Sequence, residues 1–120
     1  MMDRIDAHMH VWQLARGDYD WLTPDLGQIY RDFAIDDVWD AAEACGIGRT
    51  ILVQAAASAA ETDYLLSIAR SDPRVAGVVG WLAMDSDTAV KEIERRAADR
   101  KLLGLRPMIG DIADPSWILR

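Results

Sequence analysis

Both histidines of the chain lie two residues apart near its N-terminus, as His8 and His10. In an extended strand, residues two apart point to the same face, so Asp6, His8 and His10 are expected on one side of a strand. Neutral imidazole is the commonest metal ligand near neutral pH, and two imidazoles on one face can converge on a single ion. The alternative is a pair of ordinary histidines in an edge strand. A long connection rich in aromatic residues follows, and this favours the metal site because such connections are typical of active-site rims.

Four apolar runs alternate with amphipathic stretches and predict the elements that position these histidines. The strands are expected near residues 5–10, 50–55, 75–81 and 102–106. Strands that are apolar on both faces and alternate with helices indicate a parallel α/β sheet. The later strands are spaced by about 25 residues, which is close to the repeat of a (β/α)8 barrel. We therefore expect residues 1–120 to form a single domain of about four β/α units.

Local patterns refine two of the helices. The first helix is expected to begin at Asp36 or Asp37 and to bury one face, which comprises Val38, Ala41, Ala42 and Cys45. The second is expected to open with a capping box, in which Ser58 accepts a backbone N–H and Glu61 reaches back to the first turn.

Composition restricts the class of protein. Hydrophobic residues make up 51% of the chain and charged residues 28%, which predicts a soluble globular domain. The net charge of −7 argues against nucleic acid or an anionic membrane surface as the main partner. We expect neither a spanning helix nor a signal peptide, and the single cysteine, Cys45, cannot form an internal disulfide. A cytoplasmic location is the expectation.

Blocks at the four predicted strand ends carry a family resemblance. They are residues 6–12 (DAHMHVW), 52–55 (LVQA), 77–81 (GVVGW) and 104–108 (GLRPM), with Asp114 and Trp117 downstream. Together they resemble the amidohydrolase-2 family, and more narrowly its TIM-barrel metal-dependent hydrolases, a group that includes sugar-acid lactonases such as L-fuconolactonase and L-rhamnono-γ-lactonase. Relatives often carry histidine and glutamine soon after the strand-four arginine. Here Pro107 and Gly110 occupy that region, so substrate contacts from those two positions are not expected.

The resemblance implies that the chain is the N-terminal half of a TIM barrel, because such barrels have eight strands and typically about 250 residues. The remaining metal ligands and acid–base groups of relatives would lie beyond Arg120, so the isolated chain is expected to be inactive. Two unpaired sheet edges and exposed inward faces would promote self-association. The inward-facing side chains are expected to include Leu52, Val53, Val78, Val79 and Leu103.

The resemblance also implies roles for single residues. His8 and His10 would be metal ligands and catalytic residues for a divalent ion, with zinc expected first and manganese second. In metal-independent lactonases of the group, the same imidazoles would polarise the lactone carbonyl directly.

Residues at the other predicted strand ends are candidates for substrate binding. Arg106 can bind a carboxylate or lactone oxygen, or instead form a surface ion pair. Gln54 could donate to a substrate hydroxyl or cap a loop. Trp12 and Trp81 could wall a sugar-sized pocket, although indoles often fill cores instead.

These observations favour a hydrolase that opens a sugar lactone or related cyclic ester. This chain would be one half of that enzyme. The partner would be a small molecule. A metal-dependent decarboxylase of the same superfamily, which is a lyase, and a non-catalytic truncated half-barrel are the alternatives.

Overall fold

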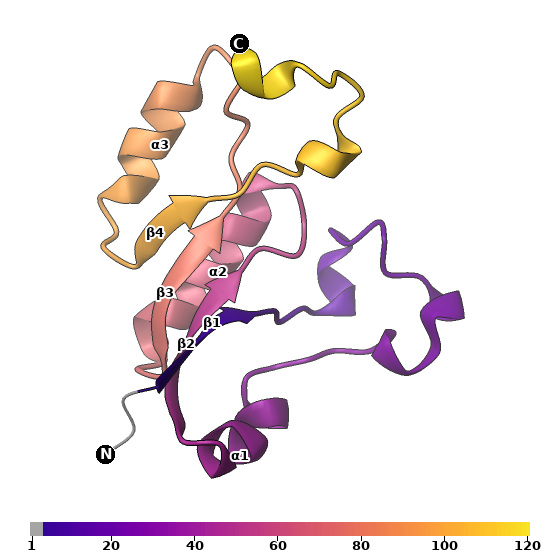
Figure 1. The fold of residues 1–120 in the computed structure, drawn as a ribbon, viewed down its shortest axis with the longest axis vertical. Helices are drawn as coiled ribbons and strands as arrows, with labels where there is room; N and C mark the ends of the chain where they lie inside the picture. Colours follow the sequence, from indigo (N-terminus) through magenta and orange to yellow (C-terminus); the bar gives the residue numbers. More distant parts are fainter. Residues whose placement is uncertain (1–3) are drawn as a thin grey trace.

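The computed structural model describes residues 4–120 and contains one sheet of four parallel strands, in the order β1-β2-β3-β4 (Figure 1). Strands and helices alternate along the chain: β1 (Arg4–Met9), α1 (Asp36–Ala44), β2 (Ile47–Val53), α2 (Ala59–Ser71), β3 (Val75–Gly80), α3 (Ala89–Ala97) and β4 (Leu102–Leu105). Each strand pairs with the strand that precedes it in the sequence, as successive β/α units do. The predicted parallel α/β arrangement is confirmed.

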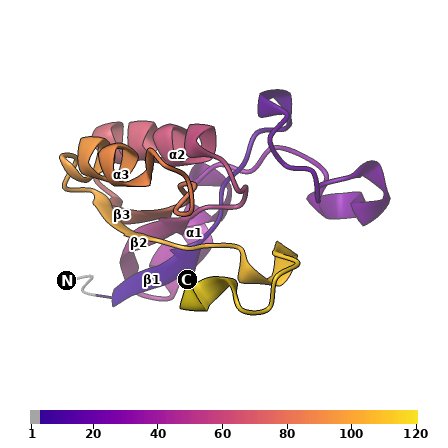
Figure 2. The ribbon, with the colours of Figure 1, turned by 90° about the horizontal axis from the view of Figure 1, so that it is seen from above.

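Helices cover one face of the sheet. α2 and α3 lie side by side over β2 and β3 (Figure 2). A single apolar core joins Trp39 of α1 and Leu65 of α2 to Leu52 and Val78 of the sheet. Leu52, Leu65 and Val78 have no solvent exposure. Burial of one such aliphatic side chain contributes about 1.5–3 kcal/mol, so this core holds the strands, and therefore their ends, in register.

The expected exposure of the inward sheet face is wrong for three residues. Leu52, Val53 and Val78 are at most 4% exposed. Leu52 and Val78 belong to the apolar core that the sheet shares with the helices, so they do not lie on the uncovered face of the sheet. Leu103 is 56% exposed, as predicted.

α1 buries only one residue of the predicted face, Ala42, and adds Trp39 to it. Trp39 and Ala42 are buried, whereas Val38 is 42% exposed and Cys45 is exposed. The indole of Trp39 takes the position in the core, with the Arg74 guanidinium 5.0 Å from the centroid of its ring. Because the large aromatic side chain occupies the inward position, its neighbour Val38 faces solvent.

Two irregular segments leave the ends of the strands. The long connection between β1 and α1 extends to one side of the sheet, with 3-10 turns at Leu14–Arg16 and Pro24–Ile29 (Figure 1). The stretch after β4 contains two further 3-10 turns, Ile109–Asp111 and Trp117–Leu119. Within residues 4–120, no helix has the length and apolar character needed to cross a membrane.

Candidate active site

The carboxyl ends of the four strands bring the predicted site residues to one edge of the sheet. One of these residues follows directly after each strand: His10 after β1, Gln54 after β2, Trp81 after β3 and Arg106 after β4. Parallel strands all end at the same edge, so residues far apart in the sequence meet there without any special loop geometry.

The two imidazoles converge on one point. Nε2 of His8 lies 3.1 Å from Nε2 of His10, and the two rings meet edge to face with their centroids 4.8 Å apart. Nδ1 of His10 lies 2.9 Å from the carbonyl oxygen of Val53. A carbonyl only accepts hydrogen bonds, so Nδ1 of His10 carries the proton and Nε2 of the neutral ring presents its lone pair toward His8. Burial lowers the pKa of His10, which keeps this ring neutral near pH 7.

This arrangement fits a divalent metal ion. Two nitrogens that each lie about 2.0–2.1 Å from a tetrahedral zinc ion are roughly 3.3 Å apart, close to the spacing of the two Nε2 atoms. Metal-bound histidines usually donate their other ring N–H to a carbonyl or carboxylate, as His10 does to Val53. Residues 4–120 hold no group of three or more histidine, cysteine or acidic side chains that could bind a metal. Within these residues, His8 and His10 are therefore the two candidate ligands of such a site.

Asp6 shares the face of the histidines and lines the same cavity. Its carboxylate accepts a hydrogen bond of 3.0 Å from the backbone N–H of His8. This contact satisfies a backbone donor of the strand end.

Arg106 and Gln54 form a reciprocal pair beside His10. Nη2 of Arg106 donates to the backbone oxygen of Gln54 at 2.7 Å and to its Oε1 at 2.8 Å. Nε2 of Gln54 donates in return to the backbone oxygen of Arg106 at 3.2 Å. Gln54 has no solvent exposure and both ends of its amide are engaged, so it holds the guanidinium in place. Arg106 is near enough to His10 to contribute, after burial and the charge of His8, to the lowering of the pKa of His10.

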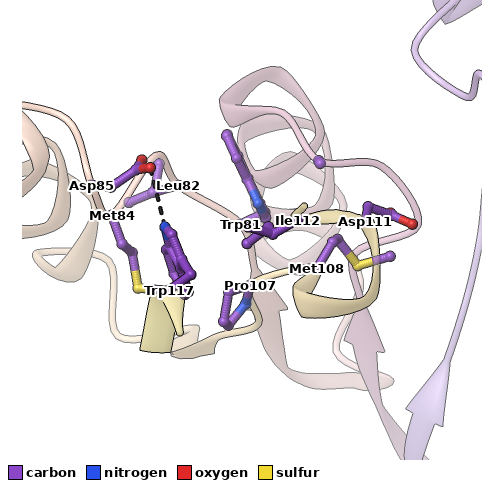
Figure 3. Close-up of a pocket in the computed structure, with 10 residues that line it drawn as sticks. Trp81, Leu82, Met84, Asp85, Pro107, Met108, Asp111, Ile112 and Trp117 are labelled. Atoms are coloured by element: carbon purple, nitrogen blue, oxygen red, sulfur yellow. Dashed lines mark hydrogen bonds between the residues drawn. The ribbon is translucent and has the colours of Figure 1, made fainter. Parts of the chain in front are cut away.

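The two candidate tryptophans line different cavities. Trp12 joins His8 and His10 around a cavity of about 430 Å³, and its Nε1 donates to the backbone oxygen of Arg31 at 2.8 Å. Trp81 lines a separate cavity of about 290 Å³ at the ends of β3 and β4 (Figure 3). The structure therefore gathers the histidines, Trp12, Gln54 and Arg106 in one region and places Trp81 beside it.

A buried carboxylate next to the site has a role that the sequence did not predict. Glu61 has no solvent exposure. Its Oε1 accepts from Nη1 of Arg16 at 2.7 Å and from the hydroxyl of Tyr19 at 2.8 Å, and its Oε2 accepts from the backbone N–H of Ala55 at 2.7 Å. Burial and the hydrogen bond to Glu61 raise the pKa of Tyr19, so the hydroxyl stays protonated and donates. These bonds fasten the β1–α1 connection to the chain just beyond Gln54.

The predicted capping box is only half formed. Oγ of Ser58 accepts the backbone N–H of Glu61 at 2.9 Å, as expected for a helix N-cap. The Glu61 side chain does not reach back to the first turn, because its two oxygens bind the β1–α1 connection and Ala55. The capping pattern was the single local signal at Glu61, and it could not reveal partners about 40 residues away.

Comparison with known proteins finds a matching family and relatives of named activity. A family model described as Amidohydrolase matches residues 5–117. An L-fucono-1,5-lactonase of Burkholderia ambifaria is 42% identical over 118 residues, which are 98% of this chain and 41% of that protein. An L-fucono-1,5-lactonase of Burkholderia multivorans is 36% identical over 92% of this chain and 37% of its own length. The chain thus spans about two fifths of the curated relatives that it matches.

Solved structures of amidohydrolases also match this chain over part of their length. A crystal structure of an amidohydrolase from Burkholderia multivorans with bound HEPES superimposes with a TM-score of 0.87 at 32% identity. A second crystal form of an amidohydrolase from that organism, with bound zinc, gives a TM-score of 0.84 at 33% identity. Each comparison covers 98% of this chain and 41% of the solved chain. The four β/α units therefore correspond to half of a TIM barrel.

Proposed function

Because the chain belongs to the amidohydrolase family, we propose that it forms the N-terminal half of a hydrolase that opens a sugar lactone or a related cyclic ester. The activity named for both curated relatives supports this reaction. The observation that carries the proposal is the pair of Nε2 atoms of His8 and His10, 3.1 Å apart at the carboxyl edge of the sheet. In TIM-barrel enzymes, catalytic groups lie at this edge.

His8 and His10 would hold a divalent ion through their Nε2 atoms, with zinc favoured over manganese. The zinc bound to one structural relative supports that choice. When bound, such an ion polarises a carbonyl oxygen and lowers the pKa of bound water to about 7. If the parent enzyme uses no metal, Nε2–H of His8, which faces the lone pair on Nε2 of His10, would instead donate to the lactone carbonyl.

Arg106 would bind an oxygen atom of the substrate. Nη2 of Arg106 is occupied by Gln54, whereas Nη1 donates to no other residue in the described part of the chain. Gln54 would then act through Arg106 and hold it in position, and Trp12 would form an apolar wall of the histidine cavity. A guanidinium that is held in a fixed position can orient a bound substrate for reaction.

The proton-transfer group of the reaction would come from outside residues 1–120, so we expect the isolated chain to have no turnover. Two alternatives to this function are a decarboxylase of the same superfamily and a half-barrel without catalytic activity. The lactonase activity of the relatives favours hydrolysis. A cytoplasmic location and self-association of the isolated chain also stay as proposals.

The test is hydrolysis of L-fucono-1,5-lactone by the longer protein that carries this sequence. The rate is measured from the acid that the reaction releases into a weakly buffered solution. His8→Ala and His10→Ala are each expected to lower kcat/KM by at least about a hundredfold, because polarising groups of this kind contribute about 10²–10³ in rate. Asp87→Ala, at an exposed position away from the histidine cavity, is the matched control. Activity of both histidine variants within a few-fold of the control would refute the assignment.

A further inference from the structure

Two of the proposed site residues are held by consecutive backbone carbonyls at the end of β2. The oxygen of Val53 accepts from Nδ1 of His10 at 2.9 Å, and the oxygen of Gln54 accepts from Nη2 of Arg106 at 2.7 Å. We call residues 53–55 the β2 exit. Because both side chains bond to this one short segment, their positions depend on where the β2 exit lies.

The last residue of the β2 exit is held from both sides. The N–H of Ala55 donates to Oε2 of Glu61 at 2.7 Å, and its oxygen accepts from Nε1 of Trp21, also at 2.7 Å. Ala55 lies beyond the last residue of β2 and is 9% exposed. Because neither the sheet nor bulk water serves its backbone groups, these two side chains satisfy them and fix the peptide.

Glu61 suits this task because its own carboxylate is fixed. It lies in the first turn of α2 and has no solvent exposure. Its Oε1 accepts from Nη1 of Arg16 at 2.7 Å and from the hydroxyl of Tyr19 at 2.8 Å, while its backbone N–H donates to Oγ of Ser58 at 2.9 Å. A carboxylate that is buried among these partners has no path to a substrate, so it cannot be the proton-transfer group.

We propose that Glu61 is a positioning residue of the enzyme: through Ala55 it fixes the β2 exit and thereby sets the positions of His10 and Arg106. The inference rests on the proposed function, to which it adds a residue that touches no substrate. Loss of the outer partners of metal-binding histidines typically costs 10–100-fold in metal affinity or activity. Glu61 acts through an additional backbone segment, so we expect an effect at the lower end, about tenfold.

The test compares two variants of the longer protein that carries this sequence, with L-fucono-1,5-lactone as substrate. Glu61→Gln should lower kcat about tenfold per folded molecule, with the folded fraction taken from circular dichroism. Leu65→Ala is the control for stability, because it truncates a fully buried side chain of the same helix and makes no change at the β2 exit. Its kcat per folded molecule should stay within about twofold of the unaltered protein.

A second variant tests whether the effect passes through Ala55. Trp21→Phe removes the hydrogen bond on the other side of that peptide, and Trp21 is 45% exposed, so the core stays intact. One hydrogen bond corresponds to a factor of roughly 2–10, and we expect kcat to fall about threefold. If both side chains act through Ala55, the double variant should fall no more than about twofold below Glu61→Gln alone. Losses that multiply to about thirtyfold would overturn this route.

Zinc affinity, measured on the same proteins by competition with a chelating dye, supplies a readout that needs no substrate. Glu61→Gln should weaken it about tenfold, and Leu65→Ala by less than about twofold. If the unaltered protein opens no lactone but Glu61→Gln still weakens zinc binding, the proposed function falls and the positioning role stands. If lactone is opened, and kcat and zinc affinity of Glu61→Gln match those of Leu65→Ala, Glu61 serves stability alone and the positioning role falls.

Discussion

The buried carboxylate of Glu61 offers the sharpest test of how the site is held together. In Glu61→Gln the side chain keeps its shape but loses its charge and one acceptor oxygen. If the new amide group faces Ala55, two N–H donors oppose each other where the structure has a hydrogen bond of 2.7 Å. If it faces the other way, it opposes Arg16 and the hydroxyl of Tyr19. Either orientation leaves a buried donor without an acceptor.

The expected loss of stability follows from these contacts. A buried donor left unpaired costs about 1–3 kcal/mol, and removal of one partner of a buried ion pair costs about 3–5 kcal/mol. Because the glutamine retains part of the network, we expect Glu61→Gln to lower the free energy of unfolding by about 3 kcal/mol. At about 4 °C per kcal/mol, this corresponds to a fall in Tm of roughly 12 °C for a domain of this size.

Urea unfolding followed by far-UV circular dichroism measures this loss. With an m-value of about 1.5 kcal/mol/M, the midpoint should fall by about 2 M. Glu94→Gln, on the exposed side of α3, is the matched control and should change stability by less than about 0.5 kcal/mol. If the midpoints of the two variants coincide, the reasoning that Glu61 fastens the β1–α1 connection is refuted.

Three further predictions follow from other contacts. Gly80→Ala should destabilise the chain by about 1–3 kcal/mol in thermal unfolding, because its Cβ would lie 2.6 Å from Cγ2 of Thr62, whereas Gly104→Ala, with open space around it, should change little. The hydrogen bonds from Arg74 lower the pKa of Asp72 below its ordinary value of 3.8. That contribution to stability is therefore present above pH 3.8 and is lost as the pH falls through the lower folded pKa, so Asp72→Asn should flatten the acid limb of the stability profile; an unchanged limb would contradict this. Zinc should raise Tm with the logarithm of its concentration, and chelation with EDTA, or alanine in place of either site histidine, should abolish the rise.

The strand ends could be predicted from the sequence because they depend on local periodicity. Alternation places the two histidines on one face of β1, and the structure brings their Nε2 atoms within 3.1 Å of each other. Apolar runs likewise located β2, β3 and β4 to within a few residues, so Gln54 and Arg106 could be assigned to strand ends.

Contacts between distant elements could not be predicted in this way. The pairing of Gln54 with Arg106 joins residues 52 positions apart, and that of Glu61 with Arg16 joins residues 45 positions apart. Neither pair has a local pattern that indicates the partner. The face of α1 was misassigned for a related reason: helical periodicity fits both Val38 and Trp39, and only packing against the sheet selects the larger side chain.

The strand order, which repeats the order of the sequence, has a consequence for synthesis on the ribosome. Each new strand can add to an edge that has already emerged, so the sheet can grow from β1 toward β4 while translation continues. The β1–α1 connection is the exception. Arg16 and Tyr19 leave the ribosome more than 40 residues before Glu61, so this connection must wait unfastened until α2 has been made. During that interval the β1–α1 connection, which lies beside the histidines, is the part of the nascent chain most open to proteases and chaperones.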